Sequence, residues 1–309
     1  MAGEVLVMGS FVADLAFRAA RLPAWGETLM GESFAMGPGG KGSNQAVAAA
    51  RAGAEVRFFS KLGNDAFGRL ARETWAADGI DASLVRDCET PTGAAAILID
   101  AARGENAIIV VPGACFTLTP GEVESAKDAI GAAKVFLTQL ELPLDAVERG
   151  LQIARTAGVK TILNPAPASG SPLPDGMIAL ADFLIPNETE AGMLTGVAVE
   201  SFEDAERAAN ALLARGARTV IVTLGARGSL LRSGDGTTLI PAFDAGPVVE
   251  TTGAGDAFCG AFAAALAEGL EVTHAARFAS AAAGISVTRA GTAPSMPRRA
   301  EVEALLAIR

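Results

Sequence analysis

Residues 135–163 decide the fold: they read Val135-Phe136-Leu137-Thr138, then a helical run over 145–156, then Val159-Lys160-Thr161-Ile162-Leu163. Two short apolar segments therefore flank one helix. Strand, helix and strand in this order are the repeating unit of proteins whose parallel sheet is covered by helices on both faces. We accordingly expect the central part of the chain to be of the α/β class.

The same alternation continues in both directions along the chain. The expected strands are 5–9, 55–60, 183–185 and 219–224, and the expected helices are 43–53 (with Ser43 as N-cap and Gly53 after the last turn), 67–77, 122–131, a short one near Met177, 189–194, 203–214, 257–267 and 273–287. No internal repeat or flexible linker interrupts the pattern. Residues 1–309 are therefore predicted to form one three-layer domain with a central, mostly parallel sheet.

Two regions, residues 15–36 and 92–111, depart from this alternation. The first mixes apolar residues with Pro23, Gly26 and Gly31 and has no helical period. The second holds two extended runs on either side of the turn residues 102–105. We predict that the two regions together form a separate small sheet.

Composition narrows the class of function. The chain has 309 residues, of which 25 are basic and 35 acidic, for a formal net charge of −10, and no run is rich in Lys and Arg. This balance argues against a nucleic-acid surface. With a single histidine, the three cysteines have no zinc-ligand spacing and are expected to be reduced packing residues. Since no signal peptide or membrane span is evident, the cytoplasm is the expected location.

Polar residues follow many of the predicted strands. In parallel sheets ligands bind beyond the carboxyl ends of the strands, so these residues are expected to line one cleft, although each alone is more often a cap or turn residue. They are Asp14, Gln139, Glu141, Asn164, Asn187, Glu190, Thr223 and Gly225.

A first glycine-rich segment, Gly37-Pro38-Gly39-Gly40-Lys41-Gly42-Ser43-Asn44-Gln45, precedes a predicted helix. Its first six residues match the dinucleotide pattern G-x-G-x-x-G, which would indicate a nicotinamide-dependent oxidoreductase. The match is weak, because Pro38 lies within the turn and no acidic ribose partner follows the next strand. A polar turn that presents Lys41 and Asn44 to hydroxyl groups fits these residues better, and a plain solvated turn is the structural alternative.

A second glycine-rich segment reads Glu250-Thr251-Thr252-Gly253-Ala254-Gly255-Asp256-Ala257-Phe258. Small residues at a helix start let amide groups converge on an anion. A carboxylate beside such a site would repel phosphate unless it takes part in the chemistry. Asp256 is therefore a candidate catalytic residue; the alternative is that Thr252 or Asp256 is only an N-cap.

Together the two glycine-rich segments, in this order and spacing, resemble the ribokinase family of carbohydrate kinases over essentially the whole chain. Further matches are Gln139-Leu140-Glu141, Asn164-Pro165-Ala166-Pro167, Pro186-Asn187-Glu188-Thr189-Glu190 and Thr223-Leu224-Gly225-Ala226-Arg227-Gly228. The resemblance implies an ATP-dependent sugar kinase that uses Mg²⁺ and K⁺, with the small sheet as a lid that closes over the sugar and pairs two subunits into a homodimer.

The resemblance also assigns roles to residues. Asp256 would be the base, with Gly253, Ala254 and Gly255 forming the anion hole. The implied sugar contacts are Asp14, Gly40, Lys41, Asn44 and Glu141; the implied nucleotide and phosphate contacts are Asn187, Thr223, Gly225, Gly228 and Ser280, with Glu190 acting on Mg²⁺ through water. The implied monovalent-cation residues are Glu250, Thr252, Ser286, Arg289, Gly291 and Ser295.

Two positions depart from the family pattern. Glu250 stands where members usually carry Asp, and Val12 stands where ribose-specific members carry an Asn that binds a sugar hydroxyl. Loss of that hydrogen bond weakens selection for the hydroxyl. The expected reaction is phosphorylation of O5 of D-ribose, with 2-deoxyribose, a fructose-like furanose or a nucleoside as alternative acceptors. A sensor that binds sugar or nucleotide without turnover is a further alternative, against which the intact Asp256 argues.

Overall fold

A computed structural model describes residues 3–103, 105–168 and 173–308. Its large sheet has eight strands, of which six are parallel and the last two antiparallel to their neighbours. In spatial order they are β14 (Gly236–Ile240), β13 (Ser229–Ser233), β12 (Thr219–Thr223), β11 (Phe183–Leu184), β10 (Lys160–Leu163), β9 (Val135–Thr138), β1 (Glu4–Met8) and β4 (Glu55–Phe59). The predicted α/β class with a central, mostly parallel sheet is confirmed.

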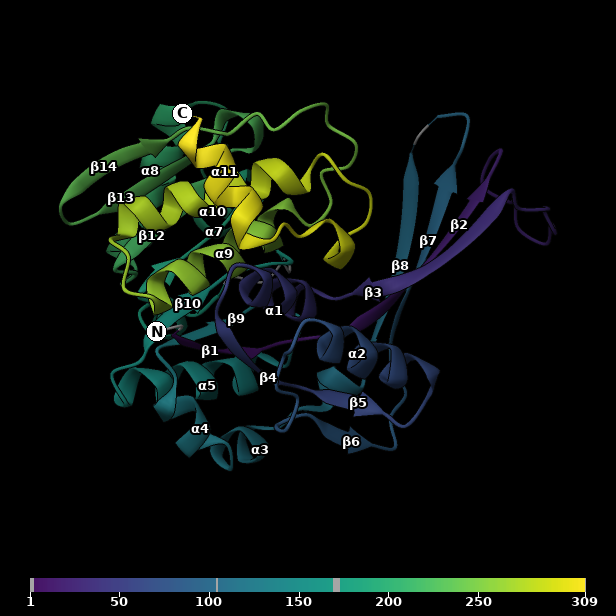
Figure 1. Ribbon diagram of the computed structural model, residues 1–309, viewed down its shortest axis with the longest axis horizontal. Helices are drawn as coiled ribbons and strands as arrows, with labels where there is room; N and C mark the ends of the chain where they lie inside the picture. The colour runs from purple at the N-terminus through teal and green to yellow at the C-terminus, as the bar shows by residue number, and fades with distance from the viewer. Residues whose placement is uncertain (1–2, 104, 169–172, 309) are drawn as a thin grey trace.

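Both faces of this sheet are buried, which explains why its strands are continuously apolar. In β1, Val5 and Val7 pack into one hydrophobic core, while Leu6 and Met8 pack into the other. Helices cover both faces (Figure 1). The first core contains α1 (Lys41–Arg51), α2 (Ala66–Ala77), α9 (Ala254–Ala267), α10 (Val272–Ser286) and α11 (Arg299–Ala307); the second contains α3 (Pro120–Glu124), α4 (Lys127–Ala132), α5 (Leu144–Thr156), α6 (Asp175–Ile178), α7 (Glu188–Thr195) and α8 (Phe202–Ala214).

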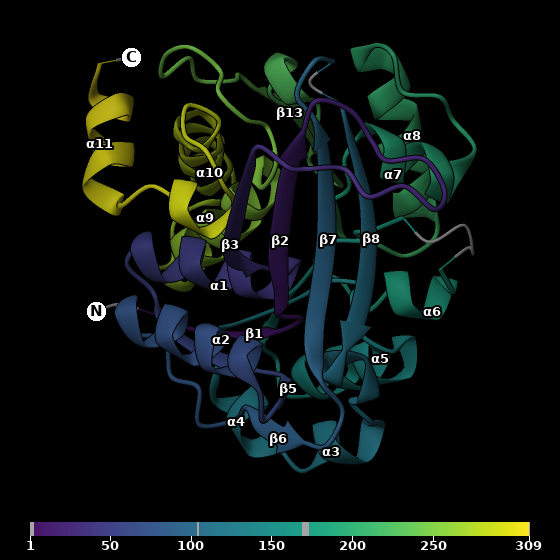
Figure 2. The same cartoon turned by 90° about the vertical axis from the view of Figure 1, so that its right-hand side faces the viewer.

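A second sheet of four strands projects from this body (Figures 1 and 2). Its strand order is β3 (Ser33–Gly39), β2 (Val12–Ala19), β7 (Thr92–Asp100) and β8 (Asn106–Gly113). The chain passes directly from β1 into β2 and returns through β3 into α1. The predicted small sheet is therefore confirmed, and its strands extend to Val12 and Gly39, so that its base lies against the start of α1. Strands β5 (Lys61–Gly63) and β6 (Arg86–Cys88) form a separate parallel pair.

Two local predictions were wrong, and one hairpin was missed. Helix α1 begins at Lys41 with Gly40 as N-cap, and Ser43 instead accepts a hydrogen bond from the indole N–H of Trp75 at 2.9 Å. The helix expected at 122–131 is two helices, α3 and α4, and α3 starts earlier because Thr119 caps it ahead of Pro120. The antiparallel hairpin β13–β14 was not predicted, although its two short runs flank the turn Gly234-Asp235.

Within the described ranges, no helix combines the length and apolar character that crossing a membrane requires.

The 3₁₀ turns η1 (Ala114–Thr117), η2 (Gly225–Arg227) and η3 (Ala293–Ser295) complete the described elements.

Candidate active site

The start of α9 forms an amide-lined turn. Gly253 is its N-cap at φ 86°, a left-handed conformation that favours glycine, and no side chain caps the helix. The interpretation of Thr252 or Asp256 as an N-cap is therefore wrong. First-turn N–H groups have no acceptor within a helix. The N–H of Ala254 donates to the carbonyl of Thr251 at 3.2 Å, which leaves those of Gly255 and Asp256 as the groups best suited to an anion.

Asp256 is held by two amide side chains from α1. Its Oδ2 accepts from Nδ2 of Asn44 at 3.0 Å, and its Oδ1 accepts from Nε2 of Gln45 at 2.9 Å. The side chain is buried in the first turn of α9. The two helices can approach because residue 260 is a glycine: a Cβ there would lie only 2.3 Å from the carbonyl oxygen of Gln45. The carboxylate is thus fixed in orientation next to the free amides.

Further side-chain hydrogen bonds hold Gln45 in place. Gln45 Nε2 also donates to Asn164 Oδ1 at 3.0 Å, and Gln139 Nε2 donates to Gln45 Oε1 at 2.6 Å. Asn164 in turn donates to the carbonyl of Ile185 at 2.8 Å. Gln45 was not among the predicted site residues, although its place beside Asn44 near the start of α1 is the signal that could have identified it.

The turn before α1 meets the ends of β1 and β9. Oε2 of Glu141 accepts from the backbone N–H of Lys41 at 2.8 Å and from the hydroxyl of Ser10. Asp14 lies on β2 with its carboxylate over Gly39, since a Cβ on Gly39 would lie 2.4 Å from Asp14 Oδ2. The structure therefore brings together Asp14, Gly40, Lys41, Asn44, Glu141 and Asp256.

Burial and mutual charge shift the pKa values of this group. Burial, followed by the charges of Glu141, Glu250 and Asp256, raises the pKa of Asp14 to about 6. For Lys41 burial acts to lower the pKa, but the carboxylates of Asp256 and Glu141 outweigh it and raise the pKa, so the ammonium stays charged. The site thus keeps one cation among several carboxylates.

Asn187, Glu190 and Thr223 come together at the neighbouring strand ends. Asn187 Oδ1 accepts from the N–H of Glu190 at 2.8 Å, and Glu190 Oε2 accepts from the N–H of Asn187 at 2.9 Å, which closes a capping box at α7. The backbone of Asn187 also pairs with that of Thr223 in an isolated parallel β-bridge. Burial raises the pKa of Glu190, against the lowering effects of the Asn187 N–H and of Lys41.

The remaining predicted nucleotide residues lie in η2 and α10. Gly225 is the first residue of the 3₁₀ turn that follows β12, and Gly228 is its C-cap. The hydroxyl of Ser280 donates to the carbonyl of Pro241 at 2.7 Å. In the part of the chain that is described, no hydrogen bond joins Ser280 to Asn187 or Thr223, so its role stays a prediction.

The predicted cation residues converge only in part. Oε2 of Glu250 accepts from the N–H of Gly291 at 2.8 Å, which joins the segment before α9 to the turn after α10. The hydroxyls of Ser286 and Ser295 donate to carbonyls three residues earlier, and the side chain of Arg289 pairs with Glu301. These residues can therefore offer backbone carbonyl oxygens and one carboxylate oxygen, which are the donors that a hard cation takes. Three or more His, Cys, Asp or Glu side chains do not cluster for a metal anywhere in the described ranges.

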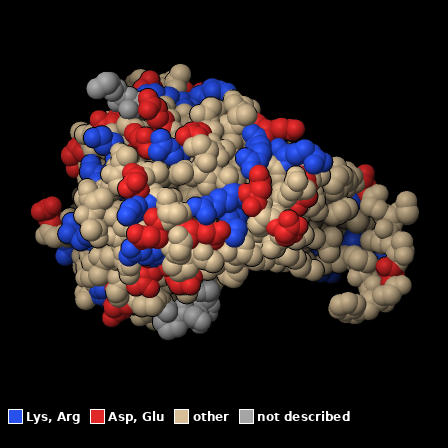
Figure 3. Space-filling model, turned by 90° about the horizontal axis from the view of Figure 1, so that it is seen from below, with Lys and Arg blue, Asp and Glu red and all other residues tan. Residues whose placement is uncertain are grey.

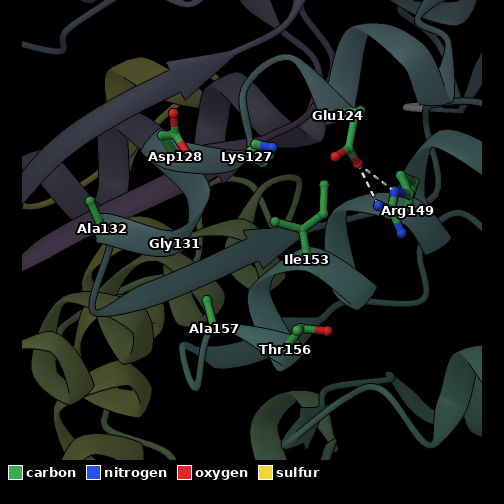
Figure 4. Close-up of a pocket in the computed structure, with 9 residues that line it drawn as sticks. All are labelled: Glu124, Lys127, Asp128, Gly131, Ala132, Arg149, Ile153, Thr156 and Ala157. Carbon is green, nitrogen blue, oxygen red and sulfur yellow. Dashed lines mark hydrogen bonds and ion pairs between the residues drawn. The ribbon is translucent and has the colours of Figure 1, made fainter.

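A pocket elsewhere on the molecule contains none of the predicted site residues. It has a volume of about 610 Å³ and lies among α3, α4 and α5 (Figure 4). Arg149 and Glu124 pair across one side of it. Because it lies on the face away from α1 and α9, it is separate from the candidate active site.

Comparison with known proteins agrees with this geometry. Residues 2–299 match the pfkB family of carbohydrate kinases. The chain is 40% identical to a ribokinase of Haemophilus influenzae, with 97% of each chain covered, and 35% identical to a deoxyribokinase of Salmonella typhi, with 95% of each covered. The solved structure of Arabidopsis thaliana ribokinase complexed with ribose and ATP superposes with a TM-score of 0.94 at 35% identity, covering 99% of both chains.

The chain therefore belongs to the pfkB family of carbohydrate kinases. Within that family it is similar to ribokinases, as the two glycine-rich segments predicted, and also to a deoxyribokinase. It is accordingly a ribokinase-like carbohydrate kinase.

Proposed function

We propose that the protein transfers the γ-phosphate of ATP to O5 of D-ribose and so forms ribose 5-phosphate. The observation that carries the proposal is the position of Asp256, a buried carboxylate oriented by Asn44 and Gln45 in the first turn of α9. The similarity to ribokinases, one of them solved with ribose and ATP, supports the substrates.

In this proposal Asp256 accepts the proton of the sugar hydroxyl as that oxygen attacks the γ-phosphorus and the bond to ADP breaks. The amides at the start of α9, in the segment Gly253 to Gly255 and chiefly that of Gly255, stabilise charge on the transferring group. Asp14, Gly40, Lys41, Asn44 and Glu141 hold the sugar. Asn44 Oδ1 is buried without a partner among the described residues, so it is free to accept a hydrogen bond from a sugar hydroxyl.

The nucleotide and its metal belong to the other end of the site. Asn187, Thr223, Gly225, Gly228 and Ser280 are the proposed nucleotide contacts. Glu190 fits Mg²⁺ held through water: one of its oxygens is engaged with Asn187, and Mg²⁺ in kinases typically keeps several waters and is bound by few carboxylates. When bound, Mg²⁺ would neutralise phosphate charge.

A monovalent cation, K⁺, is proposed beside the start of α9. The donors would be Glu250 and the backbone oxygens of Thr252, Ser286, Arg289, Gly291 and Ser295. The contact between Glu250 and Gly291 supports this site because it joins the two segments that carry the donors.

The four-stranded sheet is the proposed lid over the sugar and the surface through which two copies form a homodimer. Its strands carry several large exposed apolar side chains: Phe17, Phe34, Met36, Ile109 and Val111. They share one face of the sheet by register, and Figure 3 shows few charges on this projecting part. Exposed apolar patches of this kind mark interaction sites. We regard residues 1–309 as one kinase domain with this lid, working in the cytoplasm.

2-Deoxyribose is the second candidate acceptor because of Val12. This residue is buried at the base of β2, two residues before Asp14, and it has no group that can hydrogen-bond a sugar hydroxyl. A site without that hydrogen bond discriminates weakly between a sugar and its deoxy analogue.

The test is ADP release with Mg²⁺–ATP over ribose, 2-deoxyribose, fructose and a nucleoside, each with and without K⁺. We expect turnover to be fastest with ribose, to be measurable with 2-deoxyribose and to increase with K⁺, with the phosphate at O5 in the product by NMR. ADP release that no acceptor raises above the sugar-free rate would refute a kinase. Faster turnover of 2-deoxyribose would instead reassign the substrate.

A further inference from the structure

Arg51, the last residue of α1, holds the turn that follows α10. Its Nη1 donates to the carbonyl oxygens of Ala293 at 3.0 Å, Pro294 at 3.3 Å and Met296 at 3.0 Å. Residues 291–296 are called the C-terminal turn below. Arg51 thus joins the helix whose first residues face the sugar site to a segment more than 240 positions later in the sequence.

Asp78 fixes the guanidinium in place. Its two carboxylate oxygens accept from Nε and Nη2 of Arg51 at 2.9 and 3.0 Å, and its side chain is only 4% exposed. Asp78 is the C-cap residue of α2. A planar guanidinium can bind a carboxylate with two parallel hydrogen bonds and still present a third N–H group, whereas a lysine ammonium cannot reproduce this geometry.

The C-terminal turn contacts three segments of the active site. Its Gly291 N–H donates to Glu250, as described above, and the hydroxyl of Thr292 donates to the carbonyl of Pro38 at 3.1 Å, at the end of β3. It also packs on the N-cap of α9, since a Cβ on Gly253 would lie 3.4 Å from Cα of Thr292. Displacement of this turn would therefore move the start of α9 and the base of the lid.

The contacts of Arg51 also divide the carbonyl groups of the C-terminal turn into two sets. Those of Ala293, Pro294 and Met296 point to the guanidinium, while those of Gly291 and Ser295 accept no hydrogen bond from any residue that the structure describes. The second set consists of two of the proposed cation donors. The guanidinium thus fixes which oxygens remain for a cation.

We propose that Arg51, held by Asp78, is a positioning residue for the phosphoryl-transfer end of the site, acting through the C-terminal turn. The inference rests on the proposed kinase function. Arg51 touches no reacting group, and the sugar contacts Lys41 and Asn44 lie at the opposite end of α1. Its loss is therefore expected to lower kcat and cation binding more than it changes the KM for the sugar.

The test compares the wild type with Arg51→Gln, Arg51→Lys and Asp78→Asn. The matched control is Arg57→Gln, which removes an arginine that pairs with Asp81 and Glu4 at the sheet edge. Two readouts are taken at a temperature where each variant is folded: kcat and KM for ribose, and, without turnover, the increase in Tm caused by K⁺ relative to Na⁺.

We expect Arg51→Gln to lower kcat at least tenfold with a KM for ribose within about threefold, and to reduce the K⁺-induced increase in Tm by half or more. Arg51→Lys should not restore either value, Asp78→Asn should change both in the same direction, and Arg57→Gln should leave both unchanged. A kcat within twofold of wild type in folded Arg51→Gln would overturn the inference while leaving the kinase function intact. If Arg51→Gln does not fold, the same criterion applied to Asp78→Asn decides. A wild type inactive on every sugar would overturn both.

Discussion

Replacing Asp256 with asparagine removes the proposed base while keeping nearly the same shape. In the wild type both carboxylate oxygens accept hydrogen bonds, from Asn44 and from Gln45. The new amide can accept only one of them and places an N–H group opposite the other donor. Rotation of the Asn44 amide relieves this conflict, because its Oδ1 has no partner among the described residues and would then face the new N–H group. The variant is therefore expected to fold.

The expected loss of activity follows from the role of the carboxylate. A positioned general base contributes about 10²- to 10⁴-fold to rate, which at 1.36 kcal/mol per tenfold corresponds to about 2.7 to 5.5 kcal/mol of the barrier. Stability should change much less. One charge-assisted hydrogen bond is weakened, at about 1 kcal/mol, and a buried charge is removed, so the Tm should move by no more than about 5 °C.

The assay is steady-state ADP release with ribose and ATP each varied, together with thermal unfolding. We expect kcat to fall by at least 10²-fold with both KM values changed only slightly, which is the signature of an interaction made in the transition state. Asp182→Asn is the control: its carboxylate accepts from Thr161 and Arg155, at the amino ends of the strands and away from the site. A folded Asp256→Asn protein with a kcat within tenfold of wild type would refute the assignment of Asp256 as the base.

Four further predictions concern single residues of the site and lid. Val12→Asn should raise the ratio of kcat/KM for ribose to that for 2-deoxyribose about tenfold, the value of one hydrogen bond, and an unchanged ratio would contradict the proposed role of this position. Because the pKa of Asp14 is raised to about 6 and an ionised carboxylate accepts from a sugar hydroxyl more strongly than a protonated one, kcat/KM for ribose should fall as the pH decreases through about 6, and Asp14→Asn should abolish this dependence. The same raised pKa means that the folded protein binds this proton more tightly than the unfolded chain. The contribution of Asp14 to the free energy of unfolding is therefore present below about pH 4 and lost as the pH rises to about 6. Urea titrations in which the free energy of unfolding changes equally with pH in wild type and Asp14→Asn would contradict this prediction. If the wild type is the proposed homodimer in sedimentation velocity, Phe34→Asp on the exposed lid face should be monomeric, whereas Ile308→Asp, at another exposed apolar residue, should remain dimeric; a dimer that persists in Phe34→Asp would exclude this face as the interface.

The sequence predicted the central sheet well because strands that are buried on both faces are apolar at successive positions. Val5, Leu6, Val7 and Met8 are all apolar because alternate side chains enter different cores. The hairpin β13–β14 lacks that signal: Thr237 and Thr238 lie at the sheet edge, where polar side chains are tolerated. Edge strands of this kind look like loops until their partner is known.

Local sequence patterns predicted which residues belong to the candidate site, but not how those residues contact one another. The residue types around Asp256 fit a cap as well as a base, and the choice depends on Asn44 and Gln45, more than 200 positions away. Pattern similarity supplied Asn44, whereas Gln45 and Arg51 emerged only from their contacts. A helix start shows that an anion can bind, but only the packing of α1 on α9 shows what holds the carboxylate beside it.

The charges of the site explain why a metal is expected although the described residues form no cluster of three or more metal-ligating His, Cys, Asp or Glu side chains. Glu141, Glu190 and Asp256 lie near the ammonium of Lys41, and Glu141, Glu250 and Asp256 lie near Asp14, so carboxylates outnumber cations among these residues. Neutral sugar hydroxyls are suited to such a site, because carboxylates accept their hydrogen bonds. The phosphates of ATP are not, since like charges repel across a partly buried site. The amides at the start of α9 offset only part of that repulsion, and we expect a divalent cation that binds with the nucleotide to supply the rest. The acidic site thus suits the sugar as it stands, whereas the nucleotide is expected to enter as its metal complex.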